Sequence, residues 1–267
     1  MSIRHYTPRR RYRQGISDQK RNFLIGLIII SIIAQISMVL VSDQIRIISI
    51  LSSAISMALF SIFHAYYSYG TKYVSLYIPI TAAFGFFVEA LNVATGWPFG
   101  EIQFSDSLGP KLMGVPIFVI VGWLMISHPL LLLARQISKH WIFIFGGAGL
   151  AAWDLFLDPA MVKYGYWSWA PFSKALPFEP TIPLSNTFGW LLSGMALMAI
   201  LHATLPKERR KQGVDFKLVV LLLTWIWISR VFSNLFIFHN YGVALLGGVG
   251  LGLLLIPLLY KSLLGDV

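Results

Sequence analysis

The stretch FLIGLIIISIIAQISMVLV, residues 23–41, decides the class of this protein, because it runs for 19 residues without a charged side chain. A helix needs about 20 apolar residues to cross the hydrocarbon core of a bilayer. Seven further apolar segments follow, so the sequence predicts an all-α, polytopic integral membrane bundle of about eight helices. The predicted helices cover residues 23–41, 45–69, 74–95, 113–134, 141–158, 185–205, 217–237 and 243–260.

The composition excludes a soluble globular enzyme. Hydrophobic residues make up 57% of the 267 residues and charged residues only 12%, whereas a soluble domain carries about 25% charged residues to cover its surface. The absence of cysteine excludes disulfides, thiol catalysis and thiolate metal sites. We expect residues 1–22 to form a basic cytoplasmic tail and residues 23–267 to form a single transmembrane domain.

The distribution of basic residues predicts the orientation. With the N-terminus inside, 16 of the 21 Lys and Arg residues fall on the cytoplasmic side and four on the outer side. Basic loops are retained in the cytoplasm, so the net charge of +10 reflects topology and indicates no nucleic-acid partner. The chain is predicted to be a multi-pass protein of the cell membrane with a cytoplasmic N-terminus.

Polar side chains within predicted helices mark the candidate site, since each is costly in a membrane. The expected topology places them in the outer half of the bilayer, beside the long loops 96–112 and 159–184, where Trp167 and Trp169 provide an aromatic cover. His64, His128 and His202 map to the inner half, and we interpret them as packing or lipid-edge residues. The polar candidates are Glu89, Asn92, Asp154, Asp158, Asn186, Arg230 and Asn234.

Structural roles compete with functional ones for several candidates. Three glycines in the fifth predicted helix, Gly146, Gly147 and Gly149, indicate close packing against a neighbouring helix. Arg230 could instead neutralise one of the carboxylates, and Asp158 could form a turn before Pro159. Interhelical hydrogen bonds are the structural alternative for Asn92, Asn186 and Asn234.

Buried carboxyl groups among aromatic residues favour acid-driven chemistry on an isoprenoid double bond. Burial without a full counter-charge keeps a carboxyl protonated, which makes it a general acid. Aromatic faces stabilise cations, and a second carboxylate beside Arg230 could steady the cation or orient water. Such chemistry needs neither metal nor cofactor. The spacing of Asp154 and Asp158 also fits a magnesium-dependent membrane prenyltransferase, although the expected second aspartate cluster is missing.

Two blocks within residues 84–190 resemble the membrane carotenoid 1′,2′-hydratases, which include the γ-carotene 1′,2′-hydratases and the bisanhydrobacterioruberin hydratases. Both blocks keep several short motifs in the same order. The first holds Phe87-Val-Glu89-Ala, Gly96-Trp-Pro98-Phe99-Gly100, Leu108-Gly109 and Gly114-Val115-Pro116. The second holds Ala152-Trp153-Asp154-Leu-Phe-Leu-Asp158-Pro159, Gly165-Tyr-Trp167-Ser-Trp169, Ile182-Pro183-Leu184-Ser-Asn186 and Gly189-Trp190.

This resemblance implies a cofactor-independent hydro-lyase that adds water across the terminal C1′=C2′ double bond of an acyclic carotenoid end group. Asp154 or Glu89 would protonate the alkene, and the other would accept a proton from the attacking water, which Asn186 positions. Asp158 completes the expected catalytic set. Trp167 and Trp169 would line the polyene channel. The further substrate-binding candidates are Asn92, Arg230 and Asn234. Besides membrane lipid, other enzymes of carotenoid biosynthesis are candidate partners.

The run Gly100-Glu-Ile102-Gln-Phe104 departs from the Gly-x-Tyr-x-Tyr expected of the family. Substrate identity is therefore less constrained than reaction class. A lycopene-cyclase-like enzyme would begin with the same protonation but close a ring. A non-enzymatic lipid-binding or transport protein is the remaining alternative, although the sequence lacks the internal repeats and interrupted helices common in transporters.

Overall fold

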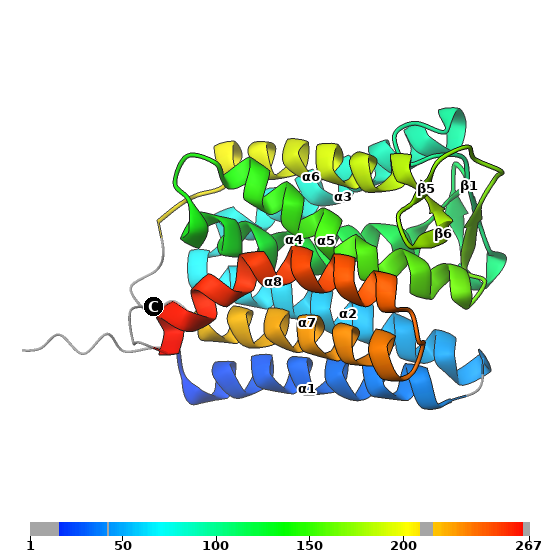
Figure 1. Cartoon of the computed structure of the whole chain (residues 1–267). Helices are drawn as coiled ribbons and strands as arrows, with labels where there is room; N and C mark the ends of the chain where they lie inside the picture. The colour runs from blue at the N-terminus through cyan, green and yellow to red at the C-terminus, as the bar shows by residue number, and fades with distance from the viewer. Residues whose placement is uncertain (1–15, 42, 209–215, 264–267) are drawn as a thin grey trace, which may run out of the picture.

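The computed structural model describes residues 16–41, 43–208 and 216–263. Within these residues, eight helices are long and apolar enough to cross a membrane, and Figure 1 shows them side by side along one common direction. This confirms the predicted all-α, multi-pass membrane bundle. The helices are α1 (Asp18–Leu40), α2 (Asp43–Tyr69), α3 (Thr71–Thr95), α4 (Ile117–Ile137), α5 (Ile142–Lys163), α6 (Leu184–Thr204), α7 (Lys217–Phe236) and α8 (Tyr241–Leu263).

The first helix begins earlier than the sequence predicts. α1 starts at Asp18, inside the segment assigned to the basic tail, and the rest of that predicted tail lies largely outside the described residues. Large apolar side chains on the outer faces of the bundle are exposed, for example Ile33 at 61% and Leu253 at 70%. An apolar exterior of this kind matches the hydrocarbon of a bilayer rather than water.

The fifth helix passes through Asp158 and Pro159 instead of ending there, so the predicted helix end and turn at Asp158 are wrong. Proline removes a single backbone N–H donor, and α5 continues past Pro159 to Lys163. The helix ends at Lys163, and Gly165 just beyond it has a φ of 71° and donates its N–H to the carbonyl of Val162 at 2.9 Å. Asp158 therefore lies on the inner face of a continuous helix.

Close packing of α5 against α6 confirms the expectation drawn from the glycine-rich sequence. A Cβ atom on Gly147 would lie 2.5 Å from Met195 Cγ and 2.7 Å from the Met195 backbone nitrogen. Gly194 on α6 faces Gly147, and a Cβ atom added to Gly194 would lie 3.0 Å from the Cα atom of Gly147. The small residues thus allow the two backbones that carry Asp154, Asp158 and Asn186 to approach each other.

The two long loops form a strand-bearing cap at one end of the bundle (Figure 1). β1 (Ile102–Phe104) pairs antiparallel with β4 (Trp167–Trp169), which places Ile102 opposite Trp169 and Phe104 opposite Trp167. This pairing fastens one loop to the other. The remaining elements of the cap are the 3₁₀ turn η1 (Asp106–Leu108), the pair β2 (Lys111–Leu112) and β3 (Val115–Pro116), and the pair β5 (Ala175–Leu176) and β6 (Glu179–Pro183).

Candidate active site

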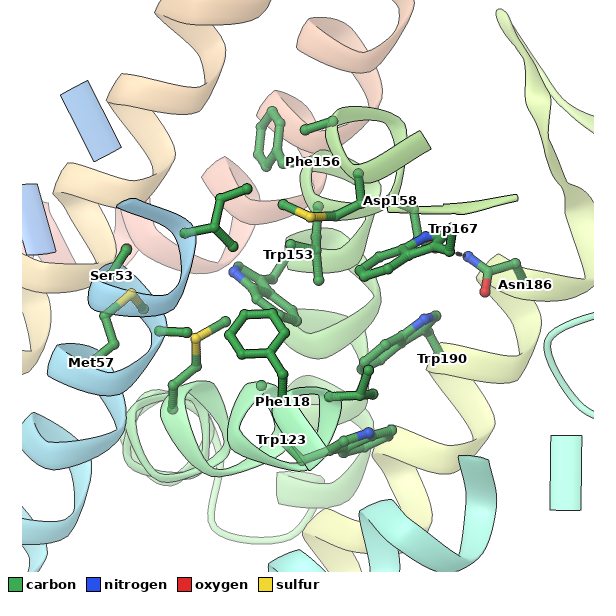
Figure 2. Close-up of a pocket in the computed structure, with 18 of the residues that line it drawn as sticks. Ser53, Met57, Phe118, Trp123, Trp153, Phe156, Asp158, Trp167, Asn186 and Trp190 are labelled. Carbon is green, nitrogen blue, oxygen red and sulfur yellow. Dashed lines mark hydrogen bonds between the residues drawn. The ribbon is translucent and has the colours of Figure 1, made fainter. Parts of the chain in front are cut away.

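A cavity lies inside the bundle below the cap. Its wall is built from α1 to α7 together with β1 and β4, and most of the lining side chains are aromatic or aliphatic. Figure 2 shows Asn186 at one side of the cavity and Ser53 and Met57 at the other, with Trp153 and Phe118 between them. The cavity is therefore elongated, with different chemistry at its two sides.

Three carboxyl or amide side chains line one side of this cavity: Glu89 on α3, Asp158 on α5 and Asn186 on α6. Each is at most 4% exposed. Asp154 lies one turn before Asp158 and is also buried, but it stands behind the cavity wall. The structure thus brings together the four residues that the sequence nominated as catalytic, from three helices, and places three of them in the wall itself.

A single amide group connects the two aspartates. Nδ2 of Asn186 donates to Oδ2 of Asp154 at 3.0 Å and also donates to Oδ2 of Asp158. Because an amide nitrogen carries two N–H groups, both are used. Oδ1 of Asp154 is buried and has no hydrogen-bond partner among the described residues. The bridge holds Asp158 at the wall, with Asp154 supporting Asn186 from behind.

Glu89 is held by an indole from the neighbouring helix. Trp123 Nε1 on α4 donates to Glu89 Oε1 at 3.1 Å. The indole can lie across α3 because residue 85 is glycine: a Cβ there would stand 2.7 Å from Trp123 Cγ. Gly85 and Trp123 together therefore fix the position of the Glu89 carboxyl.

Indole rings surround the carboxyl groups. The rings of Trp123 and Trp190 stack with centroids 4.6 Å apart, and Trp153 meets Trp190 edge to face at 6.0 Å. In the cap, Trp167 and Trp169 lie on the same face of β4, both in the cavity wall, since side chains two apart on a strand share a face. Trp169 Nε1 donates to the Phe99 carbonyl at 3.2 Å.

Two of the predicted substrate-binding residues, Asn92 and Asn234, form hydrogen bonds with nearby backbone groups. Asn92 donates to the Gly100 carbonyl at 2.9 Å and accepts from the Phe99 N–H at 2.8 Å, so it fixes the turn that leads into the cap. Asn234 donates to the Arg230 carbonyl at 2.8 Å. Neither side chain belongs to the cavity wall.

Arg230 lines the cavity, but it forms no ion pair with Glu89, Asp154 or Asp158 within the described part of the chain. The interpretation of Arg230 as a charge partner of the carboxylates is therefore wrong. Its helix, α7, lies across the cavity from the carboxyl cluster, on the side where Gln35 of α1 and Ser53 of α2 also reach the wall.

One buried polar residue of the cavity wall, Gln35, was not identified from the sequence. Gln35 is a buried polar side chain in the most apolar stretch of α1, so the rule that selected Glu89 could also have selected it. Of the histidines of the opposite half, His64 and His128 are buried packing residues, one of the two predicted alternatives, whereas His202 is partly exposed. His64 Nδ1 lies 3.0 Å from His128 Nε2, and the Tyr73 hydroxyl lies 2.9 Å from His128 Nδ1, inside the bundle.

Comparison with known proteins gives a family and one relative. Residues 45–256 match the model of a family described as carotenoid biosynthesis protein. The chain is similar to a bisanhydrobacterioruberin hydratase of Haloarcula japonica, with 30% identity over 180 residues, which cover 61% of this chain and 58% of that protein. The alignment thus spans less than two thirds of the length of the relative. No solved structure matches.

Proposed function

This chain belongs to the carotenoid biosynthesis protein family, and we propose that it adds water across the terminal C1′=C2′ double bond of an acyclic carotenoid end group. The name of the Haloarcula relative supports hydration as the reaction class. The observation that carries the proposal is the placement of Glu89 and Asp158 in one cavity whose remaining lining is mostly aromatic and aliphatic.

Asp158 is proposed as the proton donor. It reaches the cavity wall, whereas Asp154 stands behind it, and the two share the Asn186 amide. Because these buried carboxyl groups have no cationic partner among the described residues, they cannot all be ionised together. We assign the proton to Asp158, while the hydrogen bond from the Trp123 N–H stabilises Glu89 as a carboxylate. The acidic O–H of Asp158 would transfer its proton to C2′ of the alkene, whose π electrons form the new C–H bond. This step leaves a tertiary cation at C1′ and a carboxylate on Asp158.

The indole rings would stabilise that cation. The negative face of an aromatic ring attracts a cation within about 6 Å of its centroid. Trp123, Trp153 and Trp190 form a contiguous cluster in the wall next to the carboxyl groups. The attraction to the ring faces would lower the energy of the cation until water reaches it.

Water would complete the reaction with Glu89 as the base. Oxygen of a water molecule attacks C1′, and its surplus proton passes to Glu89, which gives the tertiary alcohol. Transfer of one proton from Glu89 to Asp158 then restores the starting state. The hydrogen bond from Trp123 to Glu89 leaves the second carboxyl oxygen of Glu89 to accept the water proton. No group besides substrate, water and these side chains takes part in the proposed reaction.

The test is expression of the chain in a bacterium engineered to accumulate lycopene, followed by separation of the pigments and mass spectrometry. Hydration predicts a product heavier by one water for each modified end group. A pigment of unchanged mass with a shifted absorption spectrum would instead show ring closure. Unmodified lycopene in cells that contain the membrane-inserted protein would contradict the assignment for this substrate.

A further inference from the structure

A second hollow borders the reaction cavity on the side away from the carboxyl groups. This groove runs between α1 and α7 from Gln35 and Trp225 toward the C-terminal ends of both helices, at Leu40 and Ile237. Gln35 and Arg230 line both the groove and the reaction cavity. The two spaces therefore adjoin at these side chains.

The groove is an opening between two helices that pack on other partners. α1 packs mainly on α2, and α7 packs mainly on α8, so their facing sides are not closed by tight helix–helix contact. Trp225 Nε1 of α7 donates to Gln35 Oε1 of α1 at 3.3 Å. This hydrogen bond joins the two helices at the end of the groove that borders the reaction cavity.

The wall of the groove is suited to a hydrocarbon chain. Its rim carries exposed apolar side chains, among them Leu40 at 77% and Phe232 at 56% exposure. The hydroxyls of Ser229 and Ser233 donate to carbonyls of their own helix, those of Ile226 and Arg230, at 3.3 and 3.2 Å. Their polar groups are thus occupied, and they present small side chains to the groove.

The two side chains at the junction are compatible with a conjugated chain passing between them. Gln35 uses its amide internally, since Nε2 donates to Ser31 Oγ at 2.9 Å and to Ser53 Oγ at 3.2 Å. Arg230 presents a planar guanidinium, which stacks on π systems.

We propose that the groove between α1 and α7 is a binding site for the polyene chain of the substrate, through which the chain extends from the reaction cavity to the lipid. The inference rests on the proposed function for the identity of the ligand. With its end group at Asp158, the chain would pass Trp153 and Phe118, cross between Gln35 and Arg230, and lie between α1 and α7.

The test uses substitutions that fill the groove with a large side chain from either helix. Ser229→Trp on α7 and Val39→Trp on α1 each place an indole in the groove. Leu221→Trp and Ile33→Trp are matched controls, because both residues are exposed to lipid on the same helices and line neither hollow. Each variant is purified from membranes that contain an acyclic carotenoid, and the pigment that remains bound is measured by its absorption. Turnover is measured with the full-length carotenoid and with a truncated acyclic isoprenoid that bears the same end group.

The proposal predicts that both groove-filling variants retain at least about tenfold less pigment than their controls, as expected when many apolar carbons lose their binding surface. Turnover of the full-length carotenoid falls by a similar factor, and turnover of the truncated isoprenoid does not. Equal pigment retention in filled and control variants would overturn the proposal. The proposal would also be overturned if the purified wild-type protein retained phospholipid but no pigment. Bound pigment without any hydrated product would refute the proposed function while leaving the groove as a polyene site.

Discussion

Trp123 Nε1 on α4 donates a hydrogen bond to Glu89 Oε1 on α3, over 3.1 Å. Both side chains are buried, and the contact depends on the absence of a side chain at Gly85. The bond orients a carboxyl group that the sequence alone could not position, since donor and acceptor lie 34 residues apart. It is the basis of the first prediction.

Trp123→Phe is expected to lower turnover by about tenfold to a hundredfold while the protein still inserts in the membrane. Phenylalanine retains an aromatic ring but removes the donor, and leaving a buried acceptor unsatisfied costs about 1–3 kcal/mol. Initial rates of product formation in membranes, normalised to protein content, measure the effect. Trp141→Phe is the control, because Trp141 is 57% exposed and lies outside the cavity. Equal rates in the two variants would remove Glu89 from the mechanism.

Asp158→Asn is expected to lower turnover by about 10²- to 10⁴-fold, the usual contribution of general acid–base catalysis. The amide keeps the size of the side chain but has no acidic proton to donate. Asp106→Asn is the control. The hydrogen bond from the Lys111 ammonium and the charge of that group lower the pKa of Asp106, which is exposed in the cap, and its loss should leave turnover unchanged.

Asp154→Asn distinguishes the roles of the two aspartates. Asp154 contacts Asn186 but does not reach the cavity wall, so its replacement should reduce turnover less than Asp158→Asn does. A variant of Asp154 that is as inactive as the Asp158 variant, at equal protein content, would instead assign the proton donor to Asp154.

Gly147→Ala is expected to destabilise the protein by about 1–3 kcal/mol, the usual effect of overpacking. Its new methyl group would overlap the Met195 side chain and backbone, and α5 would have to move away from α6. The melting temperature of the detergent-extracted protein measures this effect. Gly26→Ala on α1 is the control, since nothing lies within 4 Å of its Cβ position. Equal melting temperatures would contradict the close packing of α5 and α6.

The orientation of the bundle is a prediction from charge that cysteine labelling can test, because the chain has no cysteine of its own. Ser107→Cys places a thiol in the cap, and Thr71→Cys places one at the opposite end of the bundle, at the first residue of α3. A membrane-impermeant maleimide added to intact cells should label Ser107→Cys and should label Thr71→Cys only after the membrane is opened. The reverse pattern would place the N-terminus outside.

Hydropathy was sufficient to predict the bundle, because a run of about 20 apolar residues has few alternatives to a membrane helix. The cost of burying polar groups was sufficient to nominate Glu89, Asp158 and Asn186. It could not separate them from Asn92 and Asn234, whose partners are nearby backbone carbonyls that only the folded turns bring into range.

Relations between helices were less accessible from the sequence. The direction in which the Arg230 side chain points depends on how α7 is rotated relative to α3 and α5. The sequence of one helix does not determine that rotation. Gln35 was missed even though it follows the same rule as Glu89. The end of α5 just before Gly165 is consistent with the sequence, since glycine after a helix commonly adopts positive φ, whereas Pro159 alone predicts an earlier end. Ile102 and Phe104, which depart from the expected Tyr pattern, both line the cavity, so that departure alters the wall next to the substrate.

The central claim is that a carboxyl proton and a water molecule add to the same double bond. The most direct measurement is the reaction of membranes carrying the protein in deuterium oxide, with the product analysed by mass spectrometry and NMR. The account predicts one deuterium bound to carbon C2′ for every oxygen gained at C1′, and no such product with the Asp158→Asn variant. Oxygen gained at C1′ without deuterium at C2′ would contradict protonation of the alkene, and with it the roles given to Asp158 and Glu89.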